Sequence, residues 1–379
     1  MKITVLGAGR VGSAMAIDLS KSREFDVRVA DRDSHRLQAL EHSHGILGER
    51  IDLSLPSTIA RAIENADLVI SAVPGFLGFQ TLRTILESGK NVVDIAFFPE
   101  DPFQLDALAK QQGVTAIVDC GVAPGMSNLL VGYSSSQLDR TDSVSIYVGG
   151  LPSKREGLFE YRAVFSPIDV IEEYTRPSRI VENGQIVQRE ALSGIEILHF
   201  PGTGDLEAFN TDGLRTLAQT IDAPNMAEKT LRYPGHASQM KLLRDMGLFA
   251  THEVILPEGQ AVRPIDLTTS LLFPLWEMQE GERDITVMRI RVCGSLEGKR
   301  QCITYDLLDR YDEATHTTSM ARTTGYAATT AARMLSSGLF DRHGVFPPEF
   351  VGQEPDCVDF MLKGLEQRGI MYRQTITQD

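Results

Sequence analysis

The sequence predicts an α/β fold: a Rossmann doubly wound parallel sheet carrying an inserted α+β domain. Short apolar runs alternate with helical patterns over residues 1–122, as they do in βαβ units. The motif Gly7-x-Gly9-x-x-Gly12 follows the first apolar run and opens the first helical pattern. From about residue 140, apolar and polar residues alternate with period two, which is typical of an antiparallel sheet.

The first domain, residues 1–122, is expected to bind a dinucleotide. Its strands are expected at 3–8, 26–33, 67–74, 91–97 and 114–121. Its helices are expected at 10–22, 34–43, 58–66, 79–89 and 102–113. Because each helix connects two strands, the strands must run parallel.

The second domain, residues 123–319, is expected to be an α+β region with a mainly antiparallel sheet. Strands or hairpins are expected at 142–150, 178–189, 195–200 and 284–310, and helices at 224–231 and 236–247. Two further helices, 320–338 and 354–369, are expected near the end of the chain. The first is rich in small residues, which permit close helix packing, so residues 320–379 are predicted to fold back onto the first domain.

The glycine motif has a strand before it and a helix after it, the context that a pyrophosphate-binding loop requires. Gly7 permits the tight turn, Gly9 lets the backbone approach the pyrophosphate, and Gly12 lets the helix pack closely. Asp31 ends the next strand, where an acid holds the ribose hydroxyls and repels a 2′-phosphate. These residues favour NAD. Arg32 follows at once and suits adenine stacking or that phosphate, so NADP remains the alternative.

The remaining cofactor contacts are expected at the carboxyl ends of the strands. The segment Ala72 to Pro74 ends a strand where the nicotinamide half passes, and Gly121 shapes backbone beside that ring. The full set of predicted cofactor residues is Gly7, Gly9, Arg10, Val11, Gly12, Asp31, Arg32, Asp52, Ala72, Val73, Pro74 and Gly121.

Charge and composition exclude several classes of protein. The formal net charge of −14 argues against a nucleic-acid partner. No stretch approaches the roughly 18–20 apolar residues of a membrane span, so we expect no membrane partner and a cytoplasmic location. The cysteines do not suggest a disulfide framework, and without C-x-x-C or clustered His and acid signatures we expect no metal.

A family resemblance runs through most of the chain. The ordered segments VLGAGRVG, SAVPGFLG, VVDIAFFPED, VDCGVAPGMSN, YVGGLP, EEYTRPSRIVENG, TDGLRTL and TLRYPGH resemble the saccharopine dehydrogenase-like family, and most closely its lysine 6-dehydrogenase branch. The resemblance implies a Rossmann domain that includes the C-terminal helices. It also implies an inserted domain, residues 123–319, that binds and closes over the substrate and mediates oligomerisation. It also implies a homo-oligomer and NAD-dependent oxidative deamination at the ε-carbon of L-lysine, with release of ammonia.

Two positions depart from the saccharopine-forming members of this family. Those reductases carry an acid where this chain has Ala123, and a cysteine where it has Val148. The departures favour a smaller amine as substrate. Saccharopine or a carboxyalkyl-polyamine remains the alternative substrate, and a non-catalytic NAD(H)-binding regulator is a second alternative.

The chemistry requires a group that takes a proton from the amine. Asp94 and Asp119 end predicted parallel strands near the nicotinamide, where each either acts on the substrate or caps and braces its loop. His236 is the other candidate base, because histidine titrates near neutrality, or else a structural hydrogen-bonding group. Cys120 is interpreted as a small buried hydrophobe rather than a nucleophile.

The substrate carboxylate calls for arginine. Arg215 and Arg232 are the candidates, against the alternative of solvated or interdomain ion pairs. Arg176 and Arg179 come after these two candidates, because an arginine pair that flanks a proline often only braces a turn. Tyr161 is expected to line the substrate pocket or to belong to the core.

Overall fold

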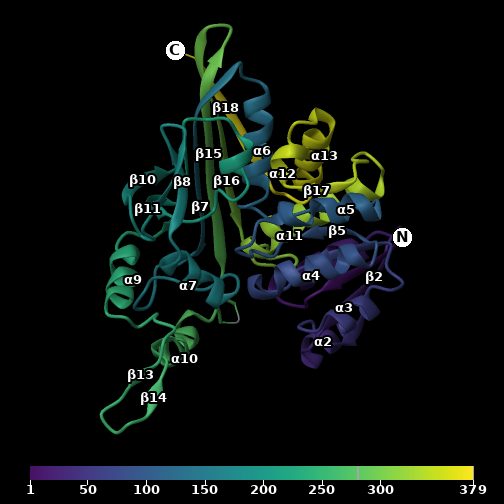
Figure 1. The fold of residues 1–379 in the computed structure, drawn as a ribbon, viewed down its shortest axis with the longest axis horizontal. Coiled ribbons are helices and arrows are strands. Elements are labelled where there is room, and N and C mark those ends of the chain that lie inside the picture. The colour runs from purple at the N-terminus through teal and green to yellow at the C-terminus, as the bar shows by residue number, and fades with distance from the viewer. Residues whose placement is uncertain (280, 379) are drawn as a thin grey trace.

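The computed structural model describes residues 1–279 and 281–378. Its first sheet contains only parallel strand pairs, which confirms the predicted Rossmann-type α/β class (Figure 1). In spatial order the strands are β17 (Gly344–Phe346), β6 (Thr115–Ile117), β5 (Asn91–Asp94), β4 (Leu68–Ser71), β1 (Lys2–Leu6), β2 (Asp26–Asp31) and β3 (Leu47–Arg50). The strand order reverses between β1 and β4, which is where such folds bind their ligands.

Alternate residues of these strands point into two separate cores, as a doubly wound sheet requires. One core contains Ile70 and Val93 and is covered by α1 (Arg10–Ser20), α2 (Ser34–His44), α6 (Met126–Ser136), α11 (Ser319–Ser336), α12 (Pro348–Val351) and α13 (Pro355–Glu366). The other contains Val69 and Val92 and is covered by α3 (Pro56–Ala62), α4 (Gly75–Glu87), the 3₁₀ turn η1 (Pro102–Leu105) and α5 (Asp106–Gln112).

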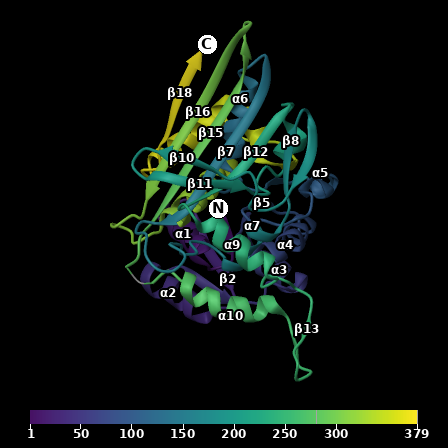
Figure 2. The same cartoon turned by 90° about the vertical axis from the view of Figure 1, so that its left-hand side faces the viewer.

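The second sheet is mixed and larger. Its main path runs through β10 (Glu196–Phe200), β11 (Gly204–Asn210), β12 (Asn225–Arg232), β7 (Arg140–Pro152), β15 (Asp284–Leu296), β16 (Lys299–Arg310) and β18 (Tyr372–Gln378), while β8 (Ser178–Glu182) pairs with β12 and β9 (Gln185–Arg189). Figure 2 shows β7, β15, β16 and β18 side by side. All of these strands except β18 lie within residues 123–319, the predicted α+β region.

The prediction of a helix over residues 224–231 is wrong. These residues form β12, which pairs parallel to β7 and antiparallel to β11. A short segment with mixed polar residues fits either helical or strand spacing, and pairing with strands distant in sequence decides between them. The correction matters because alternate residues of β12 then face in the same direction.

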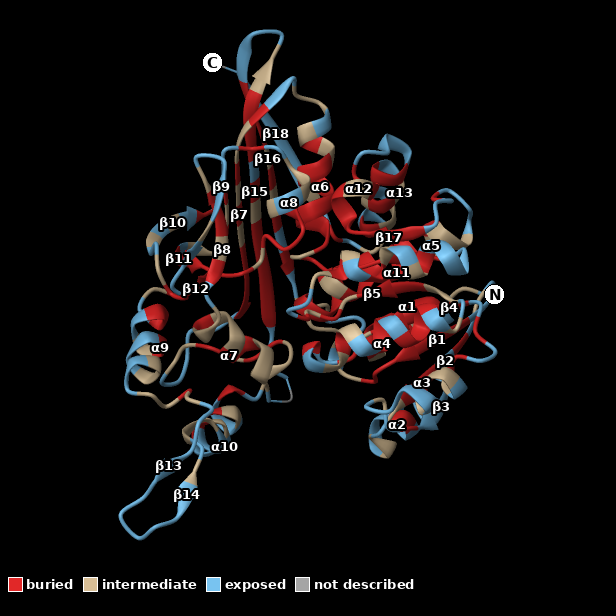
Figure 3. Ribbon diagram, viewed as in Figure 1, coloured by how far each residue is buried: buried red, intermediate tan, exposed pale blue. Residues whose placement is uncertain are grey.

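Three helices surround the lower end of the second sheet: α7 (Pro167–Thr175), α9 (His236–Asp245) and α10 (Pro264–Trp276), with the short α8 (Leu217–Thr220) elsewhere. Tyr161, Tyr174 and Trp276 are fully buried in the core that α7, α9 and α10 share. A small hairpin of β13 (Val254–Ile255) and β14 (Ala261–Val262) projects away from them and is exposed (Figure 3).

Helix α11 joins the two sheets. Its alanines Ala327, Ala328, Ala331 and Ala332 are buried in a core that contains residues of both sheets. On α1, the buried Asp18 accepts hydrogen bonds from Thr329 of α11 (2.6 Å) and from Arg368, which follows α13 (2.9 Å). The C-terminal helices are therefore tied to the first domain.

Two features of the chain differ from the sequence expectations. Residues 372–378 do not join the first domain but form β18 at the edge of the second sheet. Cys293 and Cys302 form a disulfide between directly opposed positions of β15 and β16, although no disulfide framework was expected. The cysteines lie in adjacent strands of one hairpin, so it is the strand register, not the spacing of the cysteines, that brings them together.

Candidate active site: a cavity between the two domains

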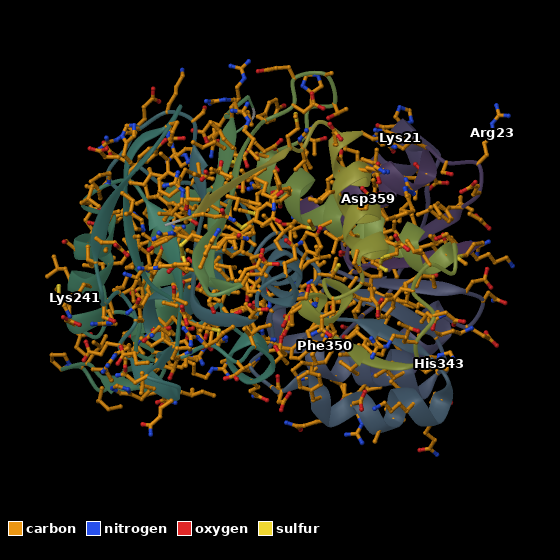
Figure 4. The ribbon with its side chains drawn as sticks, turned by 90° about the horizontal axis from the view of Figure 1, so that it is seen from above. Lys21, Arg23, Lys241, His343, Phe350 and Asp359 are labelled. Carbon is orange, nitrogen blue, oxygen red and sulfur yellow. A yellow bond between two sulfur atoms is a disulfide. The ribbon has the colours of Figure 1, made fainter. Side chains whose placement is uncertain are left out.

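A cavity of about 970 Å³ lies where the carboxyl ends of β4, β5 and β6 face the second sheet. Its walls come from the first domain, from β7 and β12, and from α7. All the predicted cofactor residues line it: Gly7, Gly9, Arg10, Val11, Gly12, Asp31, Arg32, Asp52, Ala72, Val73, Pro74 and Gly121. Figure 4 shows the two halves of the molecule from above, with Lys241 pointing outward at one end and Arg23 pointing outward at the other.

The glycine loop is built by contacts that a side chain would prevent. Gly7 has φ +107°, and a Cβ there would lie 2.6 Å from the Ala72 carbonyl oxygen. At Gly12 a Cβ would lie 2.0 Å from the carbonyl oxygen of Gly7. A Cβ at Gly9 would meet no atom closer than 3.9 Å, so the protein's own packing does not require a glycine at this position.

Gly9 is the N-cap of α1, and its helix end has no capping side chain. The first amide groups of α1 therefore lack intrahelical partners beside the cavity, and the helix dipole favours an anion there. The open space at Gly9 and these amide groups fit the pyrophosphate of a dinucleotide. The missing Cβ at Gly9 is thus explained by a ligand rather than by the fold.

Asp31 lines the cavity, but its carboxylate already accepts two backbone hydrogen bonds. It accepts the N–H of Ala8 at 2.6 Å and the N–H of Asp33 at 2.8 Å, so it also braces the glycine loop. Arg32 and Arg36 line the same cavity. The sequence reasoning missed Arg36, which lies one turn into α2.

Asp119 and Arg215 meet, but away from the cavity wall. Their side chains are 1% and 2% exposed and form a bidentate pair at 3.0 and 3.2 Å. The guanidinium also bonds the carbonyl oxygen of Phe98 and stacks over the ring of Phe97. Neither residue faces the cavity, so the expectations that Asp119 acts on the substrate and that Arg215 binds its carboxylate are corrected: the pair joins the two domains.

Asp94 ends β5 as expected but is fully buried and does not line the cavity. Its carboxylate accepts the N–H of Ala96 at 3.0 Å, and burial raises its pKa to about 7. Asp94 thus braces the loop whose residues Ile95 to Phe97 do line the cavity. This placement corrects the expectation of direct contact with the substrate.

His236 is buried behind the cavity wall and does not titrate near neutrality. Burial, with a contribution from nearby Arg232, lowers its pKa to about 3. Its Nδ1 lies 3.2 Å from the carbonyl oxygen of Phe159, so Nδ1 carries the hydrogen and Nε2 accepts from the hydroxyl of Tyr174 at 2.9 Å. The interpretation of His236 as a base is therefore wrong for this arrangement; it orients Tyr174.

Arg232 is the one predicted substrate residue that lines the cavity. It donates to Glu173 at 2.6 Å and to the hydroxyl of Tyr174 at 3.3 Å. Its guanidinium lies over the ring of Tyr161, 4.7 Å from the centroid. Tyr161 is 1% exposed and supports Arg232 from the core, which corrects the expectation that it faces the substrate.

The sequence reasoning missed most of the substrate side of the cavity. The polar residues there that it did not name are Asp169, Glu172, Glu173, Thr211, Asp212, Glu228, Thr230 and Glu277. Of these, Glu228 and Thr230 alternate with Arg232 along β12. The period-two pattern Glu-x-Thr-x-Arg is the signal that would have found them, once the segment is recognised as a strand.

The described residues give little support for a metal site or for a cysteine nucleophile. Across residues 1–279 and 281–378, no group of His, Cys, Asp and Glu side chains is arranged to hold a metal ion. Cys120 is buried, and burial together with Asp119 and Asp94 raises the pKa of its thiol to about 12, so it stays protonated. Of the helices in the described part of the chain, none is both long and apolar enough to cross a membrane.

Comparison with known families covers nearly the whole chain. The saccharopine dehydrogenase NADP binding domain matches residues 3–117, and the saccharopine dehydrogenase C-terminal domain matches residues 121–370. Residues 3–117 therefore form a nucleotide-binding domain of the NAD(P) type.

Individual relatives have low sequence identity to this chain, but the alignments cover almost the full length of both proteins. The L-glutamate-forming saccharopine dehydrogenase of Schizosaccharomyces pombe is 22% identical, over 95% of this chain and 96% of its own. Carboxynorspermidine synthase of Vibrio cholerae is 22% identical, over 94% of this chain and 93% of its own. Carboxyaminopropylagmatine dehydrogenase of a Synechocystis species is 21% identical, over 99% of this chain and 98% of its own.

The fold also matches a solved structure over nearly the whole length of both chains. Apo saccharopine dehydrogenase (L-Glu forming) of Saccharomyces cerevisiae aligns with a TM-score of 0.81 at 18% identity, covering 99% of both chains. Two family models, the ordered motifs and a shared fold lead to one conclusion: this chain belongs to the saccharopine dehydrogenase family of oxidoreductases.

Proposed function

We propose that this protein is an NAD-dependent dehydrogenase that oxidises the carbon–nitrogen bond of a small cationic amine. The ε-amino group of L-lysine is the first candidate, with ammonia released. The observation that carries this proposal is the excess of acid on the cavity wall that faces the nucleotide loop. On that wall the arginines are Arg176 and Arg232, and the acids are Asp169, Glu172, Glu173, Asp212, Glu228 and Glu277.

The guanidinium of Arg232 is already engaged within the wall, so it offers little to a ligand carboxylate. Arg232 already donates to Glu173, to Tyr174 and to the carbonyl oxygen of Leu231 at 3.0 Å. An acidic, partly enclosed wall attracts ammonium groups and disfavours several carboxylates in one ligand. The tricarboxylate saccharopine is therefore a poor match, and Ala123 and Val148, which line the cavity, offer it no polar group.

A single substrate carboxylate nevertheless has a candidate partner. Arg176 lines the cavity and stacks over the Phe97 ring, 5.2 Å from its centroid. Within the described part of the chain its Nη1 has no hydrogen-bond partner, whereas Nη2 bonds Glu172 at 3.1 Å. A buried guanidinium nitrogen without a partner is costly, and a carboxylate would satisfy it.

The two walls of the cavity would bind different ligands, the dinucleotide on one side and the amine on the other. A bound nicotinamide would accept a hydride from the carbon that bears the amine. The first domain would hold the dinucleotide through the glycine loop and Asp31, and the second domain would hold the ammonium and carboxylate groups of the amine. Asp31 favours NAD over NADP because its carboxylate would lie beside a 2′-phosphate.

A carboxyalkyl-polyamine is the second candidate substrate. The same acid-rich wall suits a chain with several ammonium groups and one carboxylate. The names of the Vibrio and Synechocystis relatives support this candidate, and these proteins are matched over more than nine-tenths of their length.

The test is NAD(P)H formation by the purified protein with L-lysine, saccharopine and carboxynorspermidine, each with NAD⁺ and with NADP⁺. We expect turnover of L-lysine with NAD⁺ and a stoichiometric release of ammonia. Turnover of saccharopine but not of lysine would contradict the proposal. Binding of NADH without oxidation of any amine would instead favour a regulatory protein.

A further inference from the structure

One wall of the cavity is a face of β12. Because side chains of a strand alternate between its two sides, Glu228, Thr230 and Arg232 share this face, and all of them line the cavity. Lys229 points to the other side of the sheet, where it bonds Glu196 at 2.6 Å. The sheet therefore presents a carboxylate, a hydroxyl and a guanidinium to the substrate side in register.

The carboxylate of Glu228 is held in a defined orientation. It is 4% exposed, and the hydroxyl of Thr211 donates to its Oε2 at 2.5 Å. The oxygens of Thr211 and Thr230 are 3.0 Å apart, so Thr230 donates to Thr211 in turn. A Cβ on Gly213 would lie 2.2 Å from that same Oε2, so the absence of a side chain at Gly213 makes room for the carboxylate.

Two neighbouring acids of this wall already have cationic partners. Glu173 is bonded to Arg232 at 2.6 Å, and Asp212 forms a bidentate pair with Arg179 at 2.8 and 2.9 Å. Asp94 is fully buried but lies off the cavity wall. Among the buried acids that line the described cavity, Glu228 is the one with no cationic partner.

We propose that Glu228 is the catalytic residue that takes the proton from the reacting amine, an inference that rests on the proposed function. The N–H bond of the substrate ammonium breaks and its proton passes to the Glu228 carboxylate, which leaves a lone pair on nitrogen. That lone pair forms the carbon–nitrogen double bond as the hydride leaves carbon for the oxidised nucleotide. Water then adds to the iminium carbon, an aldehyde and an ammonium ion form as the carbon–nitrogen bond breaks, and Glu228 returns its proton to solvent.

The surroundings of Glu228 suit this role. Burial raises its pKa to about 8, and the hydrogen bond from Thr211 opposes this rise. The negative charges of Glu173, on α7, and Asp212, after β11, raise the pKa as well, while the N–H of Gly213 lowers it. A base with such a pKa is better matched to an alkyl ammonium, whose pKa is about 10, than an ordinary carboxylate is.

The test compares Glu228→Gln with wild type in steady-state oxidation of the amine across a range of pH. Loss of a general base costs roughly 100-fold or more in kcat, with KM for the amine changed far less. The wild-type kcat/KM should rise with pH and level off above about 8. The variant should lack this plateau and recover towards pH of about 10, where the substrate amine loses its own proton.

Glu196→Gln is the matched control, because it makes the same change near β12 but on the far side of the sheet. Thermal unfolding and NADH binding establish whether Glu228→Gln is folded. If it is not, Thr211→Val serves instead: loss of the hydroxyl that donates to Glu228 should shift the kinetic pKa upward, and an unshifted kinetic pKa would overturn the role of Glu228.

Failure of this inference and failure of the proposed function give different results. A wild-type protein that oxidises an amine, together with a Glu228→Gln variant of unchanged rate and pH profile, overturns the role of Glu228 alone. A wild-type protein that oxidises no amine overturns the proposed function and this role together.

Discussion

The two walls of the cavity recognise their ligands by different means. The nucleotide wall uses backbone: Gly9 leaves open space and the first amides of α1 face it, all within one short loop. The substrate wall uses buried side chains, among them Glu228 and Arg232, which depend on partners from α7, α9 and the segment after β11. The first wall should be sensitive to an added methyl group, and the second to a lost hydrogen bond.

Breaking the connection between the walls should have the largest effect. Asp119→Ala leaves the guanidinium of Arg215 buried without its carboxylate, and loss of one partner of a buried pair costs about 3–5 kcal/mol. Urea unfolding should show this loss in the free energy of unfolding, and Arg215→Ala should cost a similar amount. Asp142→Ala, which breaks an exposed pair with Arg140, is the control and should change it by less than about 1 kcal/mol. Equal stability of the Asp119 variant would contradict the bridging role.

Two glycine variants separate folding from nucleotide binding. Gly12→Ala places a Cβ 2.0 Å from the Gly7 carbonyl oxygen, so it should lower the free energy of unfolding by about 1–3 kcal/mol and weaken NADH binding. Gly9→Ala meets no protein atom within 3.9 Å and should keep wild-type stability while weakening NADH binding at least about tenfold. Fluorescence titration and thermal unfolding measure both quantities. Undiminished NADH affinity in Gly9→Ala would remove Gly9 from the binding loop.

The substrate wall should show a pH signature in stability. His236 has a pKa near 6.5 when unfolded and about 3 when folded, so between these values the unfolded chain binds the extra proton. Its contribution is fully present above about 6.5 and is lost as pH falls, by about 1.4 kcal/mol per unit. Between neutral pH and pH of about 5, the free energy of unfolding should fall by roughly 2 kcal/mol less in His236→Gln than in wild type. Parallel stability curves would show that His236 is charged when folded.

The smallest expected effect is on the preference for NADH over NADPH when Asp31 is replaced. Asp31→Ser removes the charge beside the ribose and also the brace to Ala8, so NADH affinity should fall several-fold. NADPH affinity should rise relative to NADH by about tenfold, because Arg32 and Arg36 then face the added phosphate without a neighbouring carboxylate. Competition titrations with the two nucleotides measure the ratio. An unchanged ratio would show that Asp31 does not select the nucleotide.

The difference between the walls also explains what could be predicted from the sequence. The glycine loop, Asp31 and the strand ends at Pro74 and Gly121 are local patterns, because a turn and a helix terminus are encoded within a few residues. Every residue predicted from them lines the cavity. The doubly wound fold followed from the same alternation of strand and helix.

The substrate wall could not be found in this way because long-range pairing creates it. The segment 224–231 has no decisive local signal, and only its place between β11 and β7 makes it a strand. With a helix expected there, Glu228 was not seen to share a face with Thr230 and Arg232. Asp119 was predicted to act on the substrate and Arg215 to bind its carboxylate, but their partnership across 96 residues makes them a buried bridge, the interdomain ion pair that was the alternative for Arg215.

The central claim is that the two walls bring a carbon–nitrogen bond against the nicotinamide. L-lysine deuterated at its ε-carbon tests it most directly, with mass spectrometry of the nucleotide formed. The account predicts that the reduced nucleotide carries deuterium and that ammonia is released in equal amount. Reduced nucleotide without deuterium, or deuterated lysine recovered unchanged while saccharopine is oxidised, would contradict it.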